Sequence, residues 1–233
     1  MKHMLLAALL LAPAMVMSAP PRPYTAQYEV RRNGDTLGNA TVTLRALANG
    51  RYELTSSTVG SEGLAAIAGA TIDERSILGW SGKQLETVNY SYRQKVAWKT
   101  RERAIKVDAG KARIDSRDKD QRFSPPYQPG VLDRSAVTVA LIRDLASGRT
   151  GDLRYLVPNR DRLEAHVYRV ATTARIDTAL GQQRVVRVDR IRERADGRST
   201  SLWLGQDQNF VPLRIEQKEP DGETIEMRIL SIR

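Results

Sequence analysis

The stretch Val211–Leu230 reads VPLRIEQKEPDGETIEMRIL, and it decides the fold. Apolar and polar residues alternate on both sides of Asp221-Gly222, a dipeptide that favours a tight turn because glycine tolerates positive φ. A period of two residues is typical of a half-buried strand, so the stretch predicts a β-hairpin with one apolar and one polar face. Such a hairpin belongs in an antiparallel sheet with one face toward water.

The same alternation opens the part of the chain that follows the N-terminal segment. Tyr24, Ala26, Tyr28 and Val30 share one face of a predicted strand, and Asn33-Gly34 then forms a hairpin turn. Further strands with turns between them are predicted at 41–46, 52–58, 88–93, 163–173 and 186–188. The chain therefore begins as an antiparallel meander and returns to the same pattern later.

One segment follows the helical period instead. We expect a helix over 133–146, with Asp133 as its N-cap and Ser147-Gly148 as its stop. Apolar residues cover most of its circumference, so the helix is predicted to be buried. The sequence thus predicts a mainly β fold in which a curved antiparallel sheet, a half-barrel or an open barrel, wraps around one buried helix.

The charged and then proline-rich stretch 115–130 is predicted to be an exposed loop. It separates a strand-rich half from the helix and the later strands. Neither half has enough strands to close its own core. We therefore expect a single β-rich domain over residues 19–233.

The N-terminus has the layout of a signal peptide. Lys2 and His3 precede an apolar run, and small residues follow at Ser18 and Ala19. This layout predicts a signal peptide over 1–18, cleaved within 14–19, although an uncleaved anchor is the alternative. The chain has no cysteine and no later apolar stretch of membrane length, so we expect a soluble periplasmic protein that is not a lipoprotein.

The formal charge of +10 favours anionic partners such as phospholipid head groups or acidic glycans. Export excludes nucleic acid as the natural partner. The alternative is that the excess of arginine reflects a GC-rich genome.

The sequence offers no catalytic motif. After the predicted cleavage His166 is the one histidine, and we predict no metal, no cofactor and no catalytic residues. Carboxylates such as Asp118 and Glu164 are scattered among arginines, which leaves an envelope hydrolase open. The candidate ligand-lining residues are apolar or aromatic and are otherwise ordinary core: Leu64, Ile67, Trp80, Tyr90, Tyr92, Trp98 and Trp203. Leu64 and Ile67 belong to the small, glycine-containing segment 59–70, which is interpreted as a lid or as a short packed helix.

Several short motifs occur together along the chain. They include Tyr24-x-Ala26-x-Tyr28, the pair Tyr90 and Tyr92, Leu132-Asp133-Arg134-Ser135, and Val211-Pro212-Leu213-Arg214. This arrangement resembles the domain-of-unknown-function family 3108, which consists of exported proteins of Gram-negative bacteria. The chain departs from it at Ala179-Leu180-Gly181, where the family usually has Thr-Pro before the glycine. The resemblance implies no activity, and the expected shape is similar to the lipoprotein carriers LolA and LolB.

The sequence leaves three hypotheses for function. The first is a non-catalytic periplasmic binding or carrier protein for an amphipathic, anionic envelope lipid or lipid-linked glycan. The second is a hydrolase of envelope polysaccharide or lipid, and the third is an envelope assembly protein that binds a protein partner through a sheet edge. A concave face completely filled by the helix would count against the first.

Overall fold

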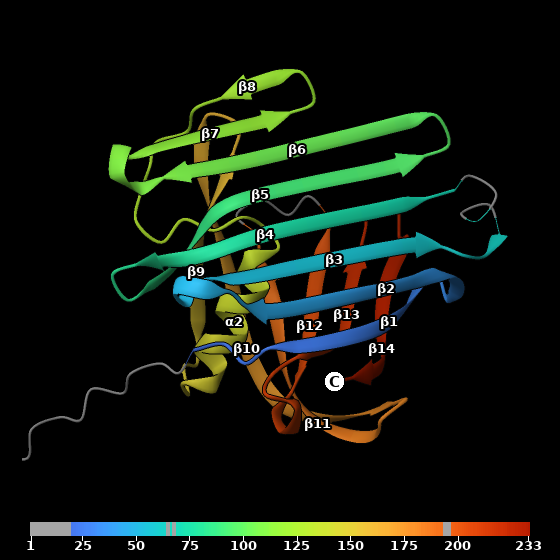
Figure 1. Cartoon of the computed structure of the whole chain (residues 1–233). Coiled ribbons are helices and arrows are strands. Elements are labelled where there is room, and N and C mark those ends of the chain that lie inside the picture. Colours follow the sequence, from blue (N-terminus) through green and yellow to red (C-terminus); the bar gives the residue numbers. More distant parts are fainter. Residues whose placement is uncertain (1–19, 64–65, 67–68, 193–196) are drawn as a thin grey trace, which may run out of the picture.

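The computed structural model describes residues 20–63, 66, 69–192 and 197–233. Within them the chain forms one antiparallel sheet and one α-helix, shown in Figure 1. The strands before the helix are β1 (Tyr24–Arg32), β2 (Asp35–Ala46), β3 (Tyr52–Gly60), β4 (Thr71–Ser81), β5 (Gln84–Val96), β6 (Lys99–Asp108), β7 (Arg113–Asp118) and β8 (Gln121–Phe123). The helix is α2 (Ala136–Ala146), and it is followed by β9 (Asp152–Asn159), β10 (Arg162–Thr178), β11 (Gly181–Ile191), β12 (Ser199–Gly205), β13 (Pro212–Lys218) and β14 (Thr224–Ile232). Single 3-10 turns lie at Ala48–Gly50, Ala109–Lys111 and Gln206–Gln208.

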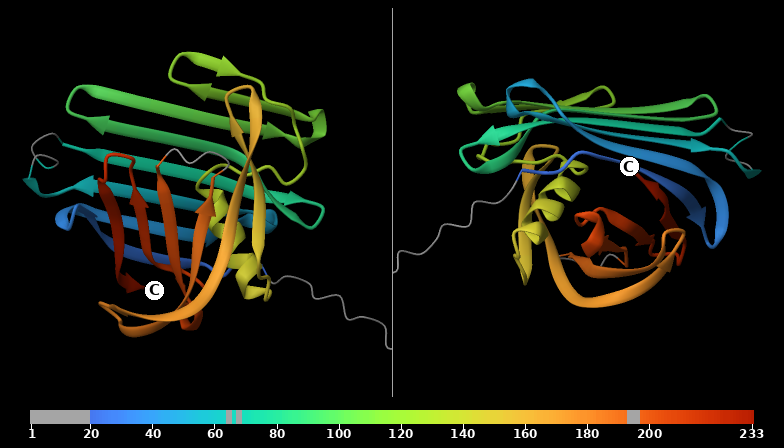
Figure 2. Two further views of the ribbon diagram at one scale, coloured as in Figure 1. Left: turned by 180° about the vertical axis from the view of Figure 1, so that it is seen from behind. Right: turned by 60° about the horizontal axis from the view of Figure 1, so that its bottom comes forward.

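The sheet consists of two arms that meet in the middle. Its order is β8-β7-β6-β5-β4-β3-β2-β1-β14-β13-β12-β11-β10-β9, so the first strand pairs with the last. The N-terminal arm is β1–β8, the C-terminal arm is β9–β14, and β8 and β9 are the two edges. The sheet curls without closing, as Figure 2 shows. The predicted mainly β fold, a curved and open antiparallel sheet with one helix, is confirmed.

Bulges account for much of the curvature, because an extra residue in one strand bends it and increases its twist. The register between β10 and β11 shifts between Val170 and Thr173. Beyond this shift the long strand β10 bends beneath the molecule, as the orange ribbon in Figure 2 shows. Further shifts lie between β4 and β5, where Val88 is the extra residue, and between β12 and β13, where Leu213 is.

The helix α2 lies in the concave face of the sheet. Val137, Val139 and Leu141 are at most 1 % exposed and pack in one core with residues of both arms. The segment just before the helix ties the arms together across the gap between them. The backbone N–H of Thr87 in β5 donates to the carbonyl of Val131, and the N–H of Leu132 donates to the carbonyl of Leu156 in β9, each at 2.9 Å. The lower part of the concave face is therefore packed core.

The helix boundary predicted at Asp133 is wrong at its first turn, since α2 begins at Ala136. Asp133 nevertheless acts as a cap from outside the helix. Its Oδ1 accepts the backbone N–H groups of Ser135 and Ala136, both at 2.9 Å. The predicted stop is confirmed, because Gly148 has a φ of +79° just beyond the last turn.

The predicted loop over 115–130 is wrong in its first part, where β7 and β8 form a hairpin at the edge of the sheet. The start of β7 is well packed, since Ile114 is fully buried. Charged residues on both faces hide the strand in the sequence: Asp115 and Arg117 lie on one face, and Asp118 lies on the other. Residues 1–18, together with Leu64 and Ile67, lie outside the described residues.

Candidate functional site

A buried carboxylate joins α2 to the N-terminal arm. Asp133 is fully buried and accepts the hydroxyls of Ser76 at 2.9 Å and Thr87 at 2.8 Å, besides the two N–H groups that it caps. Burial raises its pKa to about 6, although these hydrogen bonds oppose that shift. The network fixes where the start of the helix lies against β4 and β5.

The next two residues turn toward solvent and continue the network. Arg134 donates to the phenol oxygen of Tyr90 at 2.9 Å and to Glu74 at 3.0 Å, and its guanidinium lies 4.4 Å from the centre of the Tyr92 ring. Tyr90 and Ser135 both donate to Glu74. These contacts hold the Arg134 guanidinium in one position without using all five of its donors.

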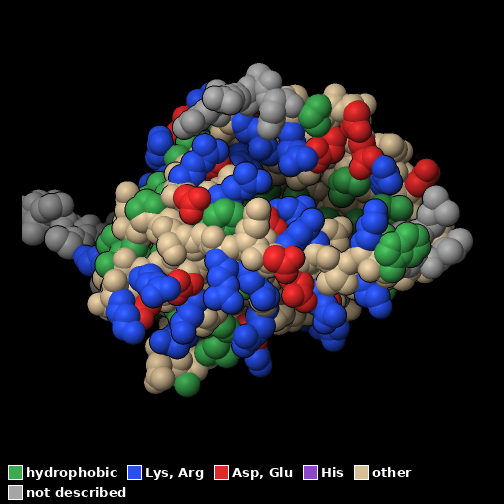
Figure 3. Space-filling model, turned by 90° about the horizontal axis from the view of Figure 1, so that it is seen from above, with side chains coloured by type: hydrophobic (Ala, Val, Ile, Leu, Met, Phe, Trp, Pro, Cys, Tyr) green, Lys and Arg blue, Asp and Glu red, His purple; other side chains and the backbone are tan. Residues whose placement is uncertain are grey.

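Arg134 and Tyr90 form part of a cleft between the two arms, which we call the inter-arm cleft. Its cavity volume is about 350 Å³. One wall is made by inner-face residues of β5–β8, including Ile105 and Phe123, and the other by β9–β11, including Val157. The cleft is strongly basic, since six arginines and two carboxylates line it: Arg103, Arg117, Arg134, Arg160, Arg190 and Arg198, with Asp118 and Glu164. Lys and Arg side chains gather over both arms in the view from above (Figure 3).

Carboxylates position several of these arginines. Arg103 lies 3.2 Å from Asp118, and Arg134 lies 3.0 Å from Glu74. Each pair leaves further guanidinium donors available, so the cleft presents N–H groups that are already held in place. This arrangement suits an anion with several oxygens, such as a phosphate or carboxylate group.

The pKa values of His166, Asp118 and Glu164, which line the cleft, are all lowered and so lie further from neutral pH. Burial lowers the pKa of His166 to about 4, and Arg190 adds to this effect. Burial alone would raise the pKa of Asp118 and of Glu164. Arg103 and Arg101 outweigh it at Asp118, and hydrogen bonds from Asn159 and Arg162 outweigh it at Glu164, so both pKa values are lowered. The imidazole is therefore neutral at pH 7, and both acids are ionised.

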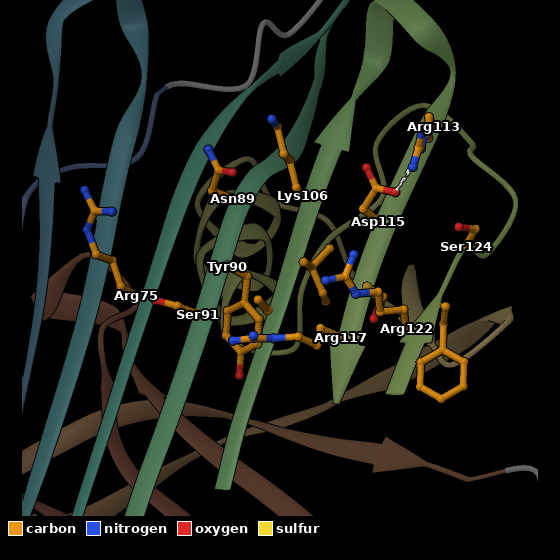
Figure 4. Close-up of a pocket in the computed structure, with 14 residues that line it drawn as sticks. Arg75, Asn89, Tyr90, Ser91, Lys106, Arg113, Asp115, Arg117, Arg122 and Ser124 are labelled. Atoms are coloured by element: carbon orange, nitrogen blue, oxygen red, sulfur yellow. Dashed lines mark hydrogen bonds and ion pairs between the residues drawn. The ribbon is translucent and has the colours of Figure 1, made fainter. Parts of the chain in front are cut away.

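A second hollow lies on the opposite, outer face of the N-terminal arm, with a volume of about 700 Å³. Arg75, Ser91, Arg117 and Arg122 belong to one row of paired residues across the strands. Figure 4 shows Arg75 on one side of Ser91 and the other two arginines on the other side. This outer groove is broad and lies on one arm, whereas the inter-arm cleft has walls from both.

The structure does not gather the predicted ligand-lining residues into one site. Tyr90 and Tyr92 share the inner face of β5, and Tyr90 reaches the cleft. Trp80 and Trp98 lie at opposite ends of the N-terminal arm, and Trp203 lies on the outer face of the C-terminal arm between Arg187 and Arg214.

Arg103, Arg160 and Arg190 are cleft residues that sequence reasoning missed. The signal available for Arg103 was its parity with Ile105, which places both on one face of β6. Nothing comparable indicated that β6 would face β9–β11, because that depends on how the sheet curls.

Two general properties bear on the site. Across residues 20–63, 66, 69–192 and 197–233, no group of three His, Cys, Asp or Glu side chains is arranged to hold a metal ion. In the same residues no helix has the length and hydropathy needed to cross a bilayer.

Comparison with known families places the chain. Residues 24–229 match the model of the family described as "Protein of unknown function (DUF3108)". The chain belongs to this family. The match spans this DUF3108 protein from β1 into β14. A search of curated proteins finds no significant match.

A solved structure of another family is similar to this DUF3108 protein in fold. A β-barrel-like protein of the domain of unknown function DUF1849 from Brucella abortus superposes with a TM-score of 0.56 at 13 % identity, over 90 % of this chain and 96 % of that one. MucB, in its complex with MucA from Pseudomonas aeruginosa, gives a TM-score of 0.32 at 12 % identity, over 91 % of this chain and 51 % of that one. The chain thus spans about half the length of MucB.

Proposed function

We propose that this DUF3108 protein is a non-catalytic binding protein of the bacterial cell envelope, whose inter-arm cleft holds the anionic group of an amphipathic ligand. One observation carries the proposal: the two arms of the sheet bring six arginines together around one cleft. The six side chains do not come from one stretch of sequence, because both arms contribute to them. Arg103 precedes α2, whereas Arg160, Arg190 and Arg198 follow it.

Binding fits the cleft better than catalysis does. A hydrolase of the kind that uses two carboxyl groups needs one acid with a raised pKa that stays protonated near neutral pH. Both carboxylates of the cleft have lowered pKa values, and His166 lacks the proton that a general acid would donate. What the cleft offers is fixed positive charge.

The helix α2 limits where a carrier of this shape could hold its ligand. Because α2 occupies the lower part of the concave face, we place the ligand above it, in the cleft. Ile105, Phe123 and Val157 provide an apolar strip beside the arginines, where the first part of an acyl chain or an aglycone would lie. The envelope location rests on the sequence of residues 1–18, and N-terminal sequencing of protein recovered from the periplasm tests it.

The experiment uses the chain that begins at Pro20, which keeps every described element. Soluble short-chain phosphatidylglycerol, and phosphatidylcholine with the same chains, are titrated into it by calorimetry. We expect the anionic lipid to bind and the zwitterionic one to bind much more weakly. Charge-assisted hydrogen bonds contribute about 1.5–3 kcal/mol each, so the double variant R103Q/R160Q should weaken binding by roughly a hundredfold or more.

Arg122→Gln is the matched control, because Arg122 is exposed and lines the outer groove but not the cleft. It should change the affinity by less than about twofold. Equal binding of both lipids, or a loss with R122Q as large as with the double variant, would overturn the assignment to the cleft. Mass spectrometry of an organic extract of natively purified protein would then identify what the chain does hold.

A further inference from the structure

The turn between β5 and β6 exposes a large aromatic side chain. Trp98 is 88 % exposed, and Val96 beside it is 38 % exposed. Ala97 takes a φ of +51° in the two-residue turn Ala97-Trp98, which directly follows Val96 at the end of β5. We call Lys95–Lys99 the β5–β6 tip.

Trp98 differs from the other two tryptophans in what it contacts. Trp80 donates its indole N–H to the carbonyl of Gly50 at 2.9 Å and lies beneath Arg143. Trp203 lies between Arg187 and Arg214, whose guanidinium groups are 5.4 and 4.6 Å from its ring centre. Trp98 makes no comparable hydrogen bond or cation–π contact with any described residue. The fold therefore gains little from a tryptophan at this position.

More apolar surface lies at the same end of the sheet. The outermost row of paired residues runs Val59, Thr71, Lys95 and Thr100 across β3–β6, and Val59 is 50 % exposed. Because side chains alternate along a strand, Val59 lies on the face of Lys95 and Val96 lies on the other face, with Trp98 in the turn that follows. In the part of the chain that the structure describes, these are the large apolar side chains exposed at this end of the sheet: Val59, Val96 and Trp98.

Positive charge accompanies this apolar surface. Lys95 and Lys99 flank the tip, both are exposed, and neither forms an ion pair with the described residues. Glu62 is the nearest exposed carboxylate in sequence to Val59. The acids one step further from the tip are engaged, since Asp73 accepts from Ser57 at 2.7 Å and Glu102 lies 3.7 Å from Arg93.

We propose that the β5–β6 tip docks onto the surface of an anionic phospholipid bilayer. An indole ring is amphipathic and is stable at the level of the head groups, where tryptophan is enriched in membrane proteins. Lys95 and Lys99 then lie near the lipid phosphates, which attract basic side chains next to a membrane-inserted residue. The proposal is independent of the inter-arm cleft, because no residue of the tip lines it.

The test is co-sedimentation of the chain from Pro20 with vesicles of phosphatidylglycerol mixed with phosphatidylcholine, and with vesicles of phosphatidylcholine alone. We expect binding to the mixed vesicles and little to the neutral ones. Trp98→Ser removes the inserted ring and should lower the partition coefficient by about tenfold. The double variant K95Q/K99Q should lower it by roughly twenty-five-fold on the mixed vesicles, at about fivefold for each charge near the surface.

Leu230→Ser is the matched control, since Leu230 is 43 % exposed on β14, away from the tip, and its loss should leave binding unchanged. W98S should bind soluble short-chain phosphatidylglycerol in calorimetry as the wild type does, since Trp98 does not line the cleft, and this separates docking by the tip from binding in the cleft. Thermal melts equal to that of the wild type confirm that W98S is folded. Wild-type binding of the vesicles by W98S, or a loss with L230S as large as that with W98S, would overturn the proposal.

Discussion

His166 lies at the wall of the inter-arm cleft and is 8 % exposed. Its pKa is lowered by burial to about 4, below its usual value of 6.5. The unfolded chain therefore binds more protons between pH 4 and 6.5. Stability should rise by about 3 kcal/mol as the pH increases through this window, and His166 should contribute no further change above it.

Proton NMR checks this prediction directly. In the chain that begins at Pro20, His166 is the one histidine, so its imidazole C2 proton gives a single resonance. We expect a titration midpoint near pH 4 in the folded chain and near pH 6.5 in urea. A midpoint near 6.5 in the folded chain would mean that water or a carboxylate reaches the ring, and it would contradict the burial of His166 in the wall of the cleft.

Other residues show how far a sequence carries a functional assignment. Tyr90 was a candidate and does line the cleft, because its parity on β5 gave its face correctly. Asp133 was expected to cap the helix, and it does so, but its bonds to Ser76 and Thr87 join positions that are 57 and 46 residues away. Local patterns indicate a side chain's face, whereas its partners depend on the fold.

The helix α2 is the element on which both arms pack. Leu141 is fully buried and has no surface accessible to water. Leu141→Ala should lower the free energy of unfolding by about 3–5 kcal/mol, because the transfer of the side chain is lost and a cavity remains. Urea denaturation monitored by circular dichroism measures the change.

Thr138→Ala is the control for Leu141→Ala, since Thr138 lies on the same helix and is only partly buried. It should change the stability by less than about 1 kcal/mol. A cost for L141A as small as that of T138A would mean that α2 is loosely seated, and the concave face would then be open to a ligand after all.

The β7–β8 hairpin shows why the sequence missed an element. Strands were found where apolar and polar residues alternate, as in β1 and β14. In β7 the outer residues Asp115 and Arg117 form ion pairs with Arg113 and Glu102, and the inner Asp118 pairs with Arg103. Because paired charges replace the apolar face, the period of two disappears from the sequence while the strand remains.

At the scale of the whole molecule, the two arms depend on each other. β1 pairs with β14 along Ala26–Arg32, and α2 packs on both arms. A fragment of residues 24–128 keeps β1–β8 but loses β14 and the helix. We expect it to lack a cooperative unfolding transition and to show little amide protection in hydrogen exchange, because its apolar inner face has no cover.

The intact chain from Pro20 serves as the reference, and it should unfold in one transition. A fragment with native-like protection of β2–β5 would show that the N-terminal arm is a domain of its own. The prediction of a single domain over 19–233 would then be wrong.

The sequence by itself determined the class of the fold, many of its strands, the turns at Asn33-Gly34 and Asp221-Gly222, the buried helix and the basic character of the protein. These features follow from the periodicity of neighbouring residues and from the backbone preferences of glycine and asparagine, which are local properties. Only the tertiary structure decided that β1 pairs with β14, that α2 occupies part of the concave face, and that arginines from β6, β11 and the β9–β10 turn face one cleft. Those relations join residues far apart in the chain through the twist and bulges of the whole sheet, and no local pattern encodes which distant strands will meet.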